Sequence, residues 1–300
     1  MTPYEIIDPD FKSLVLPNAA LLTLGEGFAW LEGPVWFADA NQLLVSDLPN
    51  DRILRWTEGT GLSVFRQPSG YANGHTRDRQ GRLIGCSHQN RCITRTELDG
   101  SETVLADRYG GRLLNGPNDV VVQSDGAIWF TDPHYGISTD YEGGKQTPEL
   151  PARVYRLDPA TGELAVVADD FTGPNGLCFS PDEQRLYIAE SGAQFAPDPV
   201  QHIRVFEVDD RGRLKHGRAF HTVAPGFADG MRCDEDGRVW TSAGDGVHCV
   251  SPEGVLLGKI LTGSTVANLV FGGRHRSRLF LCASQALMAI YTNVRGAQRP

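Results

Sequence analysis

Six polar residues recur at one position of a repeated pattern, and they are the strongest candidates for chemistry in the chain. They are Glu32, Asn73, Asn118, Asn175, Asp229 and Asn268. Hard cations such as Ca²⁺ prefer carboxylate and amide oxygens, whereas softer metals prefer thiolate and imidazole. A single Asn-Gly or Asn-Asp is typical of a turn leading into a strand. Six in register favour instead a ring of oxygen atoms that holds a divalent cation.

The pattern that positions these residues is a strand pair repeated six times. The second strands are predicted at 41–47, 81–87, 126–132, 184–190, 237–243 and 277–283, each starting eight or nine residues after its polar residue. Successive starts lie 40 to 58 residues apart, which is typical of propeller blades. We therefore predict an all-β, six-bladed β-propeller with four-stranded antiparallel blades around a central channel, which the innermost strands line.

The ends of the chain are expected to complete this ring. We predict one domain over residues 1–300, since propellers run this long as a single unit. Residues 1–13 read as an irregular N-terminal arm, because they are rich in acidic residues and proline. The apolar run Ala20-Leu-Leu-Thr-Leu24 is predicted to add a strand to the last blade, which would close the sheet edge.

A second set of residues is predicted at the same mouth of the channel, at the ends of the second strands. These positions are Asp47, Ser87, Asp132, Glu190, Ala243 and Ala283. The second strand runs antiparallel to the first, so its end returns to the face of the polar ring. Asp132 is the leading candidate for a catalytic base there, with His134 two residues further on. An Asp before a proline is also a common turn former, which is the structural alternative.

Two insertions follow the second strands of blades three and four, at 137–151 and 191–201. Both begin at the predicted mouth, so we expect them to cover a bound substrate. The alternative is that they are solvated loops without a role in binding.

Composition excludes several classes of function. The net charge of −9 argues against a nucleic-acid partner, and no apolar stretch is long enough to span a membrane. The N-terminus lacks a signal-peptide pattern, so we expect a cytoplasmic protein. The six cysteines show no CxxC spacing and are predicted to be buried free thiols. There is no GxSxG or HExxH motif and no phosphate-binding glycine loop.

Several motifs taken together resemble the gluconolactonase and regucalcin (senescence marker protein) family of six-bladed propellers. They are Glu32-Gly-Pro-Val-Trp, Asn118-Asp-Val, Trp129-Phe-Thr-Asp-Pro, Pro174-Asn-Gly-Leu and Asp229-Gly-Met. The resemblance covers roughly residues 25–290. The runs Asn115-Gly-Pro-Asn-Asp and Phe130-Thr-Asp-Pro look more like the bacterial gluconolactonase branch. Animal regucalcins carry an arginine where this chain has Gly116.

The resemblance implies a function and a set of site residues. A divalent cation, most commonly Ca²⁺ with Zn²⁺, Mg²⁺ or Mn²⁺ as other possibilities, would be bound by Glu32, Asn118, Asn175 and Asp229. The reaction would be hydrolysis of a sugar lactone such as glucono-1,5-lactone to the aldonic acid, with Asp229 or Asp132 activating water. The resemblance also implies Asn118 as a substrate contact. From the predicted channel wall itself, we further expect contacts from Asn73, His88 and His134.

Two other functions fit the same ring of oxygens. A phosphotriesterase of the diisopropyl fluorophosphatase type would use a similar cation against a tetrahedral phosphorus centre. A non-catalytic propeller would use calcium for rigidity alone. The expected partner in the enzyme hypotheses is a small molecule, and the sequence leaves monomer and dimer open.

Overall fold

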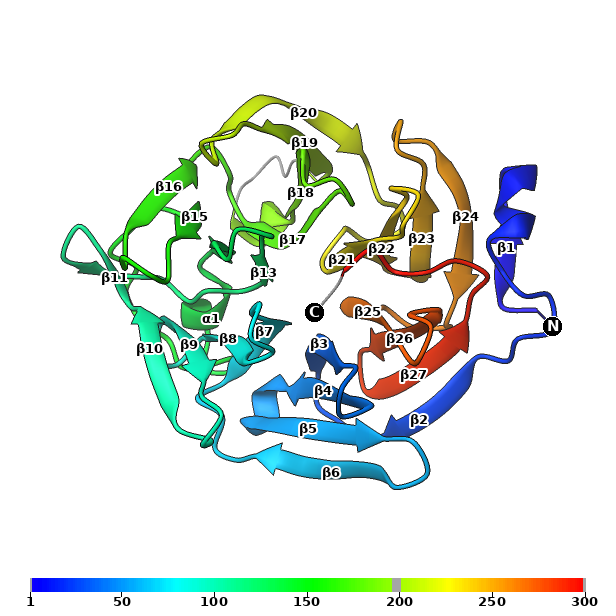
Figure 1. Ribbon diagram of the computed structural model, residues 1–300, viewed down its shortest axis with the longest axis horizontal. Coiled ribbons are helices and arrows are strands. Elements are labelled where there is room, and N and C mark those ends of the chain that lie inside the picture. Colours follow the sequence, from blue (N-terminus) through cyan, green and yellow to red (C-terminus); the bar gives the residue numbers. More distant parts are fainter. Residues whose placement is uncertain (1, 196–200, 299–300) are drawn as a thin grey trace.

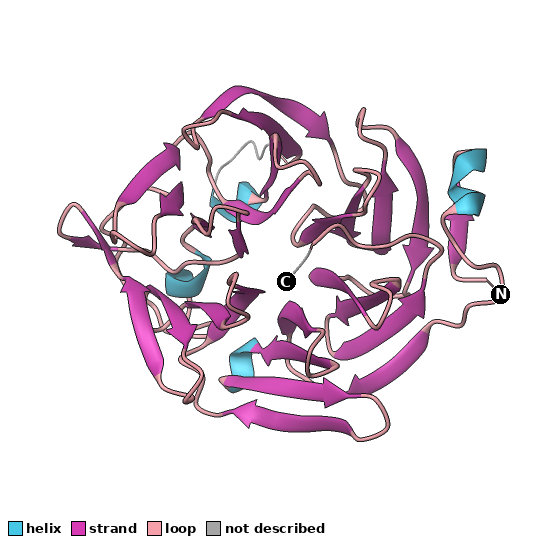
Figure 2. Cartoon of the chain, viewed as in Figure 1, coloured by secondary structure: helices cyan, strands magenta, loops and turns pink. Residues whose placement is uncertain are grey.

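The computed structural model describes residues 2–195 and 201–298 and has six antiparallel sheets arranged around a central axis. Figure 1 shows the sheets following one another in chain order around this axis, and Figure 2 shows that nearly all regular structure is strand. In each sheet the chain starts near the axis and steps outward, and in the last two sheets the N-terminal segment supplies the strand at the rim. The predicted fold, a six-bladed propeller with four-stranded blades, is confirmed.

The strands fall into four sets by their position in a blade. The innermost strands are β3 (Leu31–Phe37), β7 (Ala72–Arg77), β13 (Val120–Val122), β17 (Pro174–Phe179), β21 (Met231–Cys233) and β25 (Asn268–Gly272). The second strands are β4 (Gln42–Asp47), β8 (Leu83–Ser87), β14 (Ile128–Asp132), β18 (Arg185–Glu190), β22 (Val239–Ala243) and β26 (Arg278–Ala283). The third strands are β5 (Arg52–Thr57), β9 (Cys92–Thr96), β15 (Arg153–Leu157), β19 (Ile203–Val208), β23 (Gly246–Val250) and β27 (Ala286–Tyr291). The outer strands are β6 (Gly61–Arg66), β10 (Glu102–Ala106), β16 (Leu164–Ala168), β20 (Leu214–His221), β24 (Leu256–Leu261) and β2 (Leu22–Glu26).

The N-terminal segment closes the ring and also extends one blade. Strand β2 pairs with β27, so the predicted closing strand is confirmed. The expected irregular arm is wrong, because β1 (Tyr4–Ile6) pairs with β24 as a fifth strand and a 3₁₀ helix, η1 (Pro9–Ser13), follows it. Phe11 in that helix is fully buried with its ring 6.0 Å from Trp240. Burial of this aromatic side chain anchors the arm to blade five.

The hydrophobic cores lie between neighbouring blades. In one of them, Trp129 and Val154 of blade three pack with Leu177, Ile188 and Phe206 of blade four. The same arrangement recurs around the ring, because alternate side chains of each strand face the next sheet. The six cysteines are buried free thiols, as predicted.

Short elements outside the blades lie in connecting segments. They are β11 (Arg108–Tyr109), β12 (Arg112–Leu113), α1 (Tyr135–Ser138), η2 (Leu48–Asn50) and η3 (Gly192–Phe195). Helix α1 lies at the start of the first insertion and η3 at the start of the second; residues 196–200 of the second lie outside the described residues. No helix in the described part of the chain is long and apolar enough to cross a membrane.

Candidate functional site

The structure brings the six recurrent polar residues together around the axis, and hydrogen bonds join several of them. Asn73 donates from Nδ2 to Asn118 Oδ1 at 2.7 Å, and Asn118 donates from Nδ2 to Asn175 Oδ1 at 2.6 Å. Between the last and the first blade, Asn268 Nδ2 donates to Glu32 Oε2 at 3.1 Å. These bonds fix the amide orientations and hold neighbouring blades at a common level.

Irregular pairing at the start of the innermost strands positions three of these side chains. The register between first and second strand shifts between Glu32 and Val35, between Ala72 and His75, and between Pro174 and Leu177. Bulges of this kind bend a strand and redirect its side chains, and they are frequent beside active sites. Asn73 and Asn175 lie within the last two of these irregular segments.

A glycine follows the ring residue in four blades, and close packing around the axis requires it. A Cβ at Gly176 would lie 2.0 Å from the carbonyl oxygen of Asp229, and one at Gly230 would lie 2.0 Å from Asn268 Oδ1. Gly33 and Gly74 meet the backbone of the next blade in the same way. The glycine that follows the ring residue in these blades is therefore a sequence signal for close backbone packing around the axis.

The ring opens into a pocket of about 270 Å³ at the mouth where the innermost strands begin. Its lining residues are Trp30, Glu32, Leu48, Asn73, Asn118, Tyr135, Ser138, Thr139, Glu142, Asn175, Ser191, Ala193, Phe227 and Asp229. Both insertions contribute side chains, so their predicted place at the mouth is confirmed. No Lys, Arg or His is among these described lining residues.

The two carboxylates of the ring are held in an unfavourable electrostatic setting. Burial raises the pKa of Glu32 to about 7, against hydrogen bonds from Gly33 and Asn268 that lower it. Burial also raises the pKa of Asp229 well above its ordinary value, and the charge of Glu32 raises it further. Both shifts express the free-energy penalty of placing negative charge in this channel without a counter-charge.

This donor set fits a divalent cation. Two buried carboxylates would gain the counter-charge they lack, and the amide oxygens of Asn118 and Asn175 each keep a free lone pair beside the hydrogen bond they accept. Asn73 Oδ1 is buried without any hydrogen-bond partner. No three His, Cys, Asp or Glu side chains converge on a common point anywhere in the described residues. Amide oxygens would therefore have to complete the coordination sphere.

Asp132 does not line the pocket. It is completely buried, and its two carboxylate oxygens accept hydrogen bonds from the amides of Asn115 and Gly116 at 2.9–3.0 Å. Burial raises its pKa to about 7, a value suited to a base, but its oxygens point into the loop before β13. Geometry therefore outweighs the pKa, and the structure gives Asp132 a role in holding that loop.

The acids at the equivalent positions of two other blades have the same structural role. Asp47 accepts a hydrogen bond from the amide of Ala29 at 3.0 Å, and Glu190 accepts bonds from the amides of Thr172 and Gly173 at 2.8 Å. In each blade the acid that ends the second strand thus binds the segment leading into the first. The three acids of the predicted second ring therefore hold loops in place and do not face the pocket.

The two histidines predicted to contact substrate are also outside the pocket lining. His88 is fully buried behind the ring, where its Nε2 accepts a hydrogen bond from Asn73 Nδ2 at 3.2 Å. His134 donates from Nε2 to the carbonyl of Leu150 at 3.1 Å and contacts the ring of Phe195. Burial lowers the pKa of His88 to about 4, so its imidazole is neutral.

Sequence reasoning missed the apolar and aromatic part of the mouth. Trp30, Leu48, Tyr135 and Phe227 line the pocket beside the ring. Tyr135 donates from its hydroxyl to the carbonyl of Gly173 at 3.0 Å, which places its ring across from blade four. Trp30 and Phe227 each lie two residues before a ring residue, a spacing that the repeat could have revealed.

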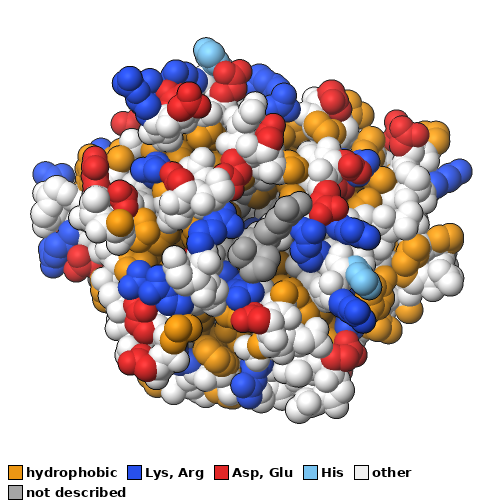
Figure 3. All heavy atoms as spheres, viewed as in Figure 1, with side chains coloured by type: hydrophobic (Ala, Val, Ile, Leu, Met, Phe, Trp, Pro, Cys, Tyr) orange, Lys and Arg blue, Asp and Glu red, His pale blue; other side chains and the backbone are white. Residues whose placement is uncertain are grey.

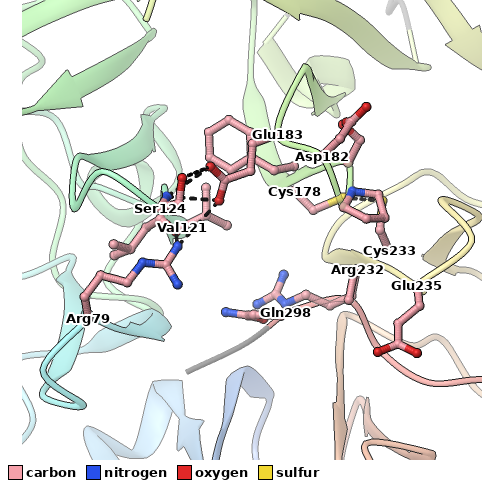
Figure 4. Close-up of a pocket in the computed structure, with 15 residues that line it drawn as sticks. Arg79, Val121, Ser124, Cys178, Asp182, Glu183, Arg232, Cys233, Glu235 and Gln298 are labelled. Carbon is pink, nitrogen blue, oxygen red and sulfur yellow. Dashed lines mark hydrogen bonds and ion pairs between the residues drawn. The ribbon is translucent and has the colours of Figure 1, made fainter.

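A second, larger pocket of about 590 Å³ lies at the opposite end of the axis and contains no ring residue. Figure 3 shows this face, with Lys and Arg side chains gathered around its centre, and Figure 4 shows the pocket's lining residues. Arg232 lines this pocket, and its Nη1 lies 3.7 Å from Asp119 Oδ2. Because Asp119 is adjacent to Asn118 in sequence, this ion pair lies between the ring and the far mouth.

Fold and site together define a six-bladed propeller whose axis carries a buried pair of acids among amides, open at one mouth. The chain belongs to the family described as SMP-30/Gluconolactonase/LRE-like region, which it matches over residues 30–285.

Relatives cover most of the chain. It is 30% identical to a gluconolactonase from Zymomonas mobilis, over 96% of this chain and 85% of the relative. It is 26% identical to the pentonolactonase XacC of Haloferax volcanii, over 83% and 80%. Among solved structures, a gluconolactonase from Xanthomonas campestris superposes with a TM-score of 0.91 at 38% identity, covering 97% of this chain and 94% of that one.

Proposed function

We propose that the protein hydrolyses sugar lactones to aldonic acids and that a divalent cation, most simply Ca²⁺, is its cofactor. The observation that carries the proposal is the ring itself: two buried carboxylates with raised pKa values face one small pocket among amides. The names of its relatives, gluconolactonase and pentonolactonase, support a lactone as substrate. No comparable observation favours a phosphotriester.

The chain's own residues would divide the work as follows. Glu32, Asp229, Asn175 and Asn118 would hold the cation, which when bound supplies Lewis acidity toward a carbonyl oxygen. Asn73 offers an unpartnered Oδ1 to a substrate hydroxyl. The apolar side chains of Trp30, Leu48 and Phe227 would exclude bulk water from the pocket.

Asp229 is the proposed base. Its carboxylate lines the pocket and would accept a proton from the water molecule that attacks the lactone carbonyl. Attack forms the new carbon–oxygen bond, the ring ester bond breaks, and the departing ring oxygen takes up the proton that Asp229 accepted, which gives the open aldonic acid and regenerates the carboxylate. Asp132 has no part in this scheme, because it does not line the pocket.

The test measures hydrolysis of glucono-1,5-lactone, with proton release as the signal, before and after metal is removed by chelation and dialysis. Activity should disappear with the metal and return with added Ca²⁺. Glu32→Gln and Asn175→Ala should lose both metal and activity while remaining folded. Wild-type turnover in either variant would refute the assignment of the site. If the metal-loaded protein hydrolyses no lactone and chelation only lowers its melting temperature, a non-catalytic propeller is favoured. A parallel assay with a fluorophosphonate distinguishes the lactonase from a phosphotriesterase, because hydrolysis of the fluorophosphonate alone would favour the phosphotriesterase.

A further inference from the structure

The pocket carries a third carboxylate, Glu142, which comes from the insertion at 137–151 and not from the ring. With Glu32 and Asp229 it makes three acidic side chains around a space that no described basic side chain lines. When these acids are ionised, a ligand in this pocket binds beside an excess of negative charge. The effect of Glu142 on a ligand depends on whether its carboxylate is held in place and whether a basic side chain neutralises it.

Contacts with His88 hold the segment around Glu142 against the propeller. His88 Nδ1 donates a hydrogen bond to the carbonyl oxygen of Glu142 at 3.1 Å, while its Nε2 accepts the bond from Asn73. Gly136 and Gly143 pack against the side chain of His88, since a Cβ at Gly136 would lie 2.4 Å from His88 Cγ and one at Gly143 would lie 3.0 Å from His88 Cβ. The insertion is thus docked at the level of the ring.

The Glu142 carboxylate has no cationic partner in the described residues. Its nearest basic group is His88 Nδ1, 3.9 Å from Oε2, and that imidazole is neutral. Glu142 also does not join Glu32 and Asp229 in a metal-binding cluster, because no group of three such side chains converges in the described part of the chain. A divalent cation on Glu32 and Asp229 would balance those two charges and leave that of Glu142 unbalanced.

We infer that Glu142 makes this pocket selective for uncharged, polyhydroxylated lactones and against lactones that carry a carboxylate or phosphate. A carboxylate accepts hydrogen bonds from hydroxyl groups and repels a second anion at short range. The same repulsion would assist release of the product, which is itself a carboxylate. The inference rests on the proposed lactonase function for its kinetic form, but the charge selection applies to binding alone as well.

Two lactones that differ in charge test this selectivity. D-glucono-1,4-lactone and D-glucaro-1,4-lactone share one lactone ring and differ in a terminal CH₂OH against a carboxylate. Wild-type protein should prefer the neutral compound in kcat/KM by about 10-fold or more. Glu142→Gln should remove most of that preference and bind gluconate more tightly, whereas Glu142→Asp should retain the preference. Glu163→Gln, an exposed position between β15 and β16, is the control and should change nothing.

Equal kcat/KM for the two lactones in wild-type protein, or an unchanged ratio in Glu142→Gln, would overturn the inference. Binding of both compounds is measured in parallel by saturation-transfer NMR on the calcium-loaded protein. If neither compound is hydrolysed, the proposed function fails, yet a preference for the neutral compound that is lost in Glu142→Gln still supports the role of Glu142. Equal binding of both compounds to wild-type protein refutes it.

Discussion

The charge of Glu32 raises the pKa of Asp229 across the central channel, second only to burial itself. The two acids come from blades one and five, and neither has an Arg or Lys partner within 4 Å among the described residues. Charges buried in this way destabilise a fold unless a ligand compensates them. The pair therefore forms the core of the cation site proposed above, and a cation bound there would offset this destabilisation.

Calcium should stabilise the wild-type protein more than it stabilises a variant with one carboxylate fewer. A ligand that binds only the folded state adds about 2.7 kcal/mol at 100 times its dissociation constant. The melting temperature of wild-type protein should rise on addition of Ca²⁺ after chelation, and that of Glu32→Gln should rise much less. An equal rise in both proteins would place the calcium site elsewhere.

Asp132→Asn and Asp229→Asn should have opposite effects on stability and on activity. The comparison distinguishes an acid that holds a loop from an acid that belongs to the site. Asp132→Asn turns an amide NH₂ toward the amides of Asn115 and Gly116, so it should lower the free energy of unfolding by about 2 kcal/mol. Its kcat should stay near the wild-type value. Asp229→Asn removes a strained charge, so it should stabilise the metal-free protein while abolishing hydrolysis. Urea unfolding in chelator and a lactone assay measure both, and loss of kcat in a folded Asp132→Asn would restore Asp132 as a base.

The repeat made the architecture predictable from sequence. The run 126–132 became β14 (Ile128–Asp132), and each ring residue could be found by its spacing from such a strand. The pairing of β1 with β24 could not be read in the same way, because it joins segments at opposite ends of the chain and depends on Phe11 reaching a distant core. Alternation specifies the faces of a strand but not its non-local partner.

Side-chain direction limited the prediction of the site. That the end of β14 returns to the mouth follows from antiparallel pairing, but the orientation of Asp132 depends on which amides the preceding loop presents. Likewise, His88 is at the correct level but is covered by the insertion, through contacts with Gly136 and Gly143. Both facts depend on packing of irregular segments, which leave no periodic signal in the sequence.

His75 should make the protein less stable as the pH falls. Burial lowers its pKa to about 3 in the folded protein, and its Nε2 lies 2.9 Å from Ser46 Oγ. The unfolded chain binds the proton first, so stability attributable to His75 is full above about pH 6.5 and is lost as the pH falls toward 3. Between pH 7.5 and pH 5 this amounts to about 2 kcal/mol. The loss should be smaller by that amount in His75→Gln, measured by urea unfolding in chelator, and unchanged in the exposed control His216→Gln.

Gly176→Ala should disturb the position of the ring residues more than the pairing of strands in its own blade. The added methyl would lie 2.0 Å from the carbonyl oxygen of Asp229, a backbone atom that cannot move without shifting the acid itself. Overpacking of this kind costs about 1–3 kcal/mol. Calcium affinity and kcat should fall together. Gly162→Ala is the control for strain alone: its φ of +77° disfavours alanine although a Cβ there would meet nothing within 4 Å, so it should lower stability and leave calcium affinity and kcat unchanged. Retained calcium affinity in Gly176→Ala would show that the ring tolerates displacement.

The two nitrogens of His88 can be tested separately, because asparagine imitates the Nδ1 side of histidine and glutamine the Nε2 side. His88→Asn should keep the hydrogen bond to the Glu142 carbonyl and lose the one from Asn73, while His88→Gln should do the reverse. If His88 positions the insertion, KM should rise several-fold in His88→Gln and much less in His88→Asn, with kcat and calcium affinity little changed in both. A general loss of stability would move both variants alike and would leave no such split. Equal KM values in the two variants would show that the Glu142 link does not position the pocket wall.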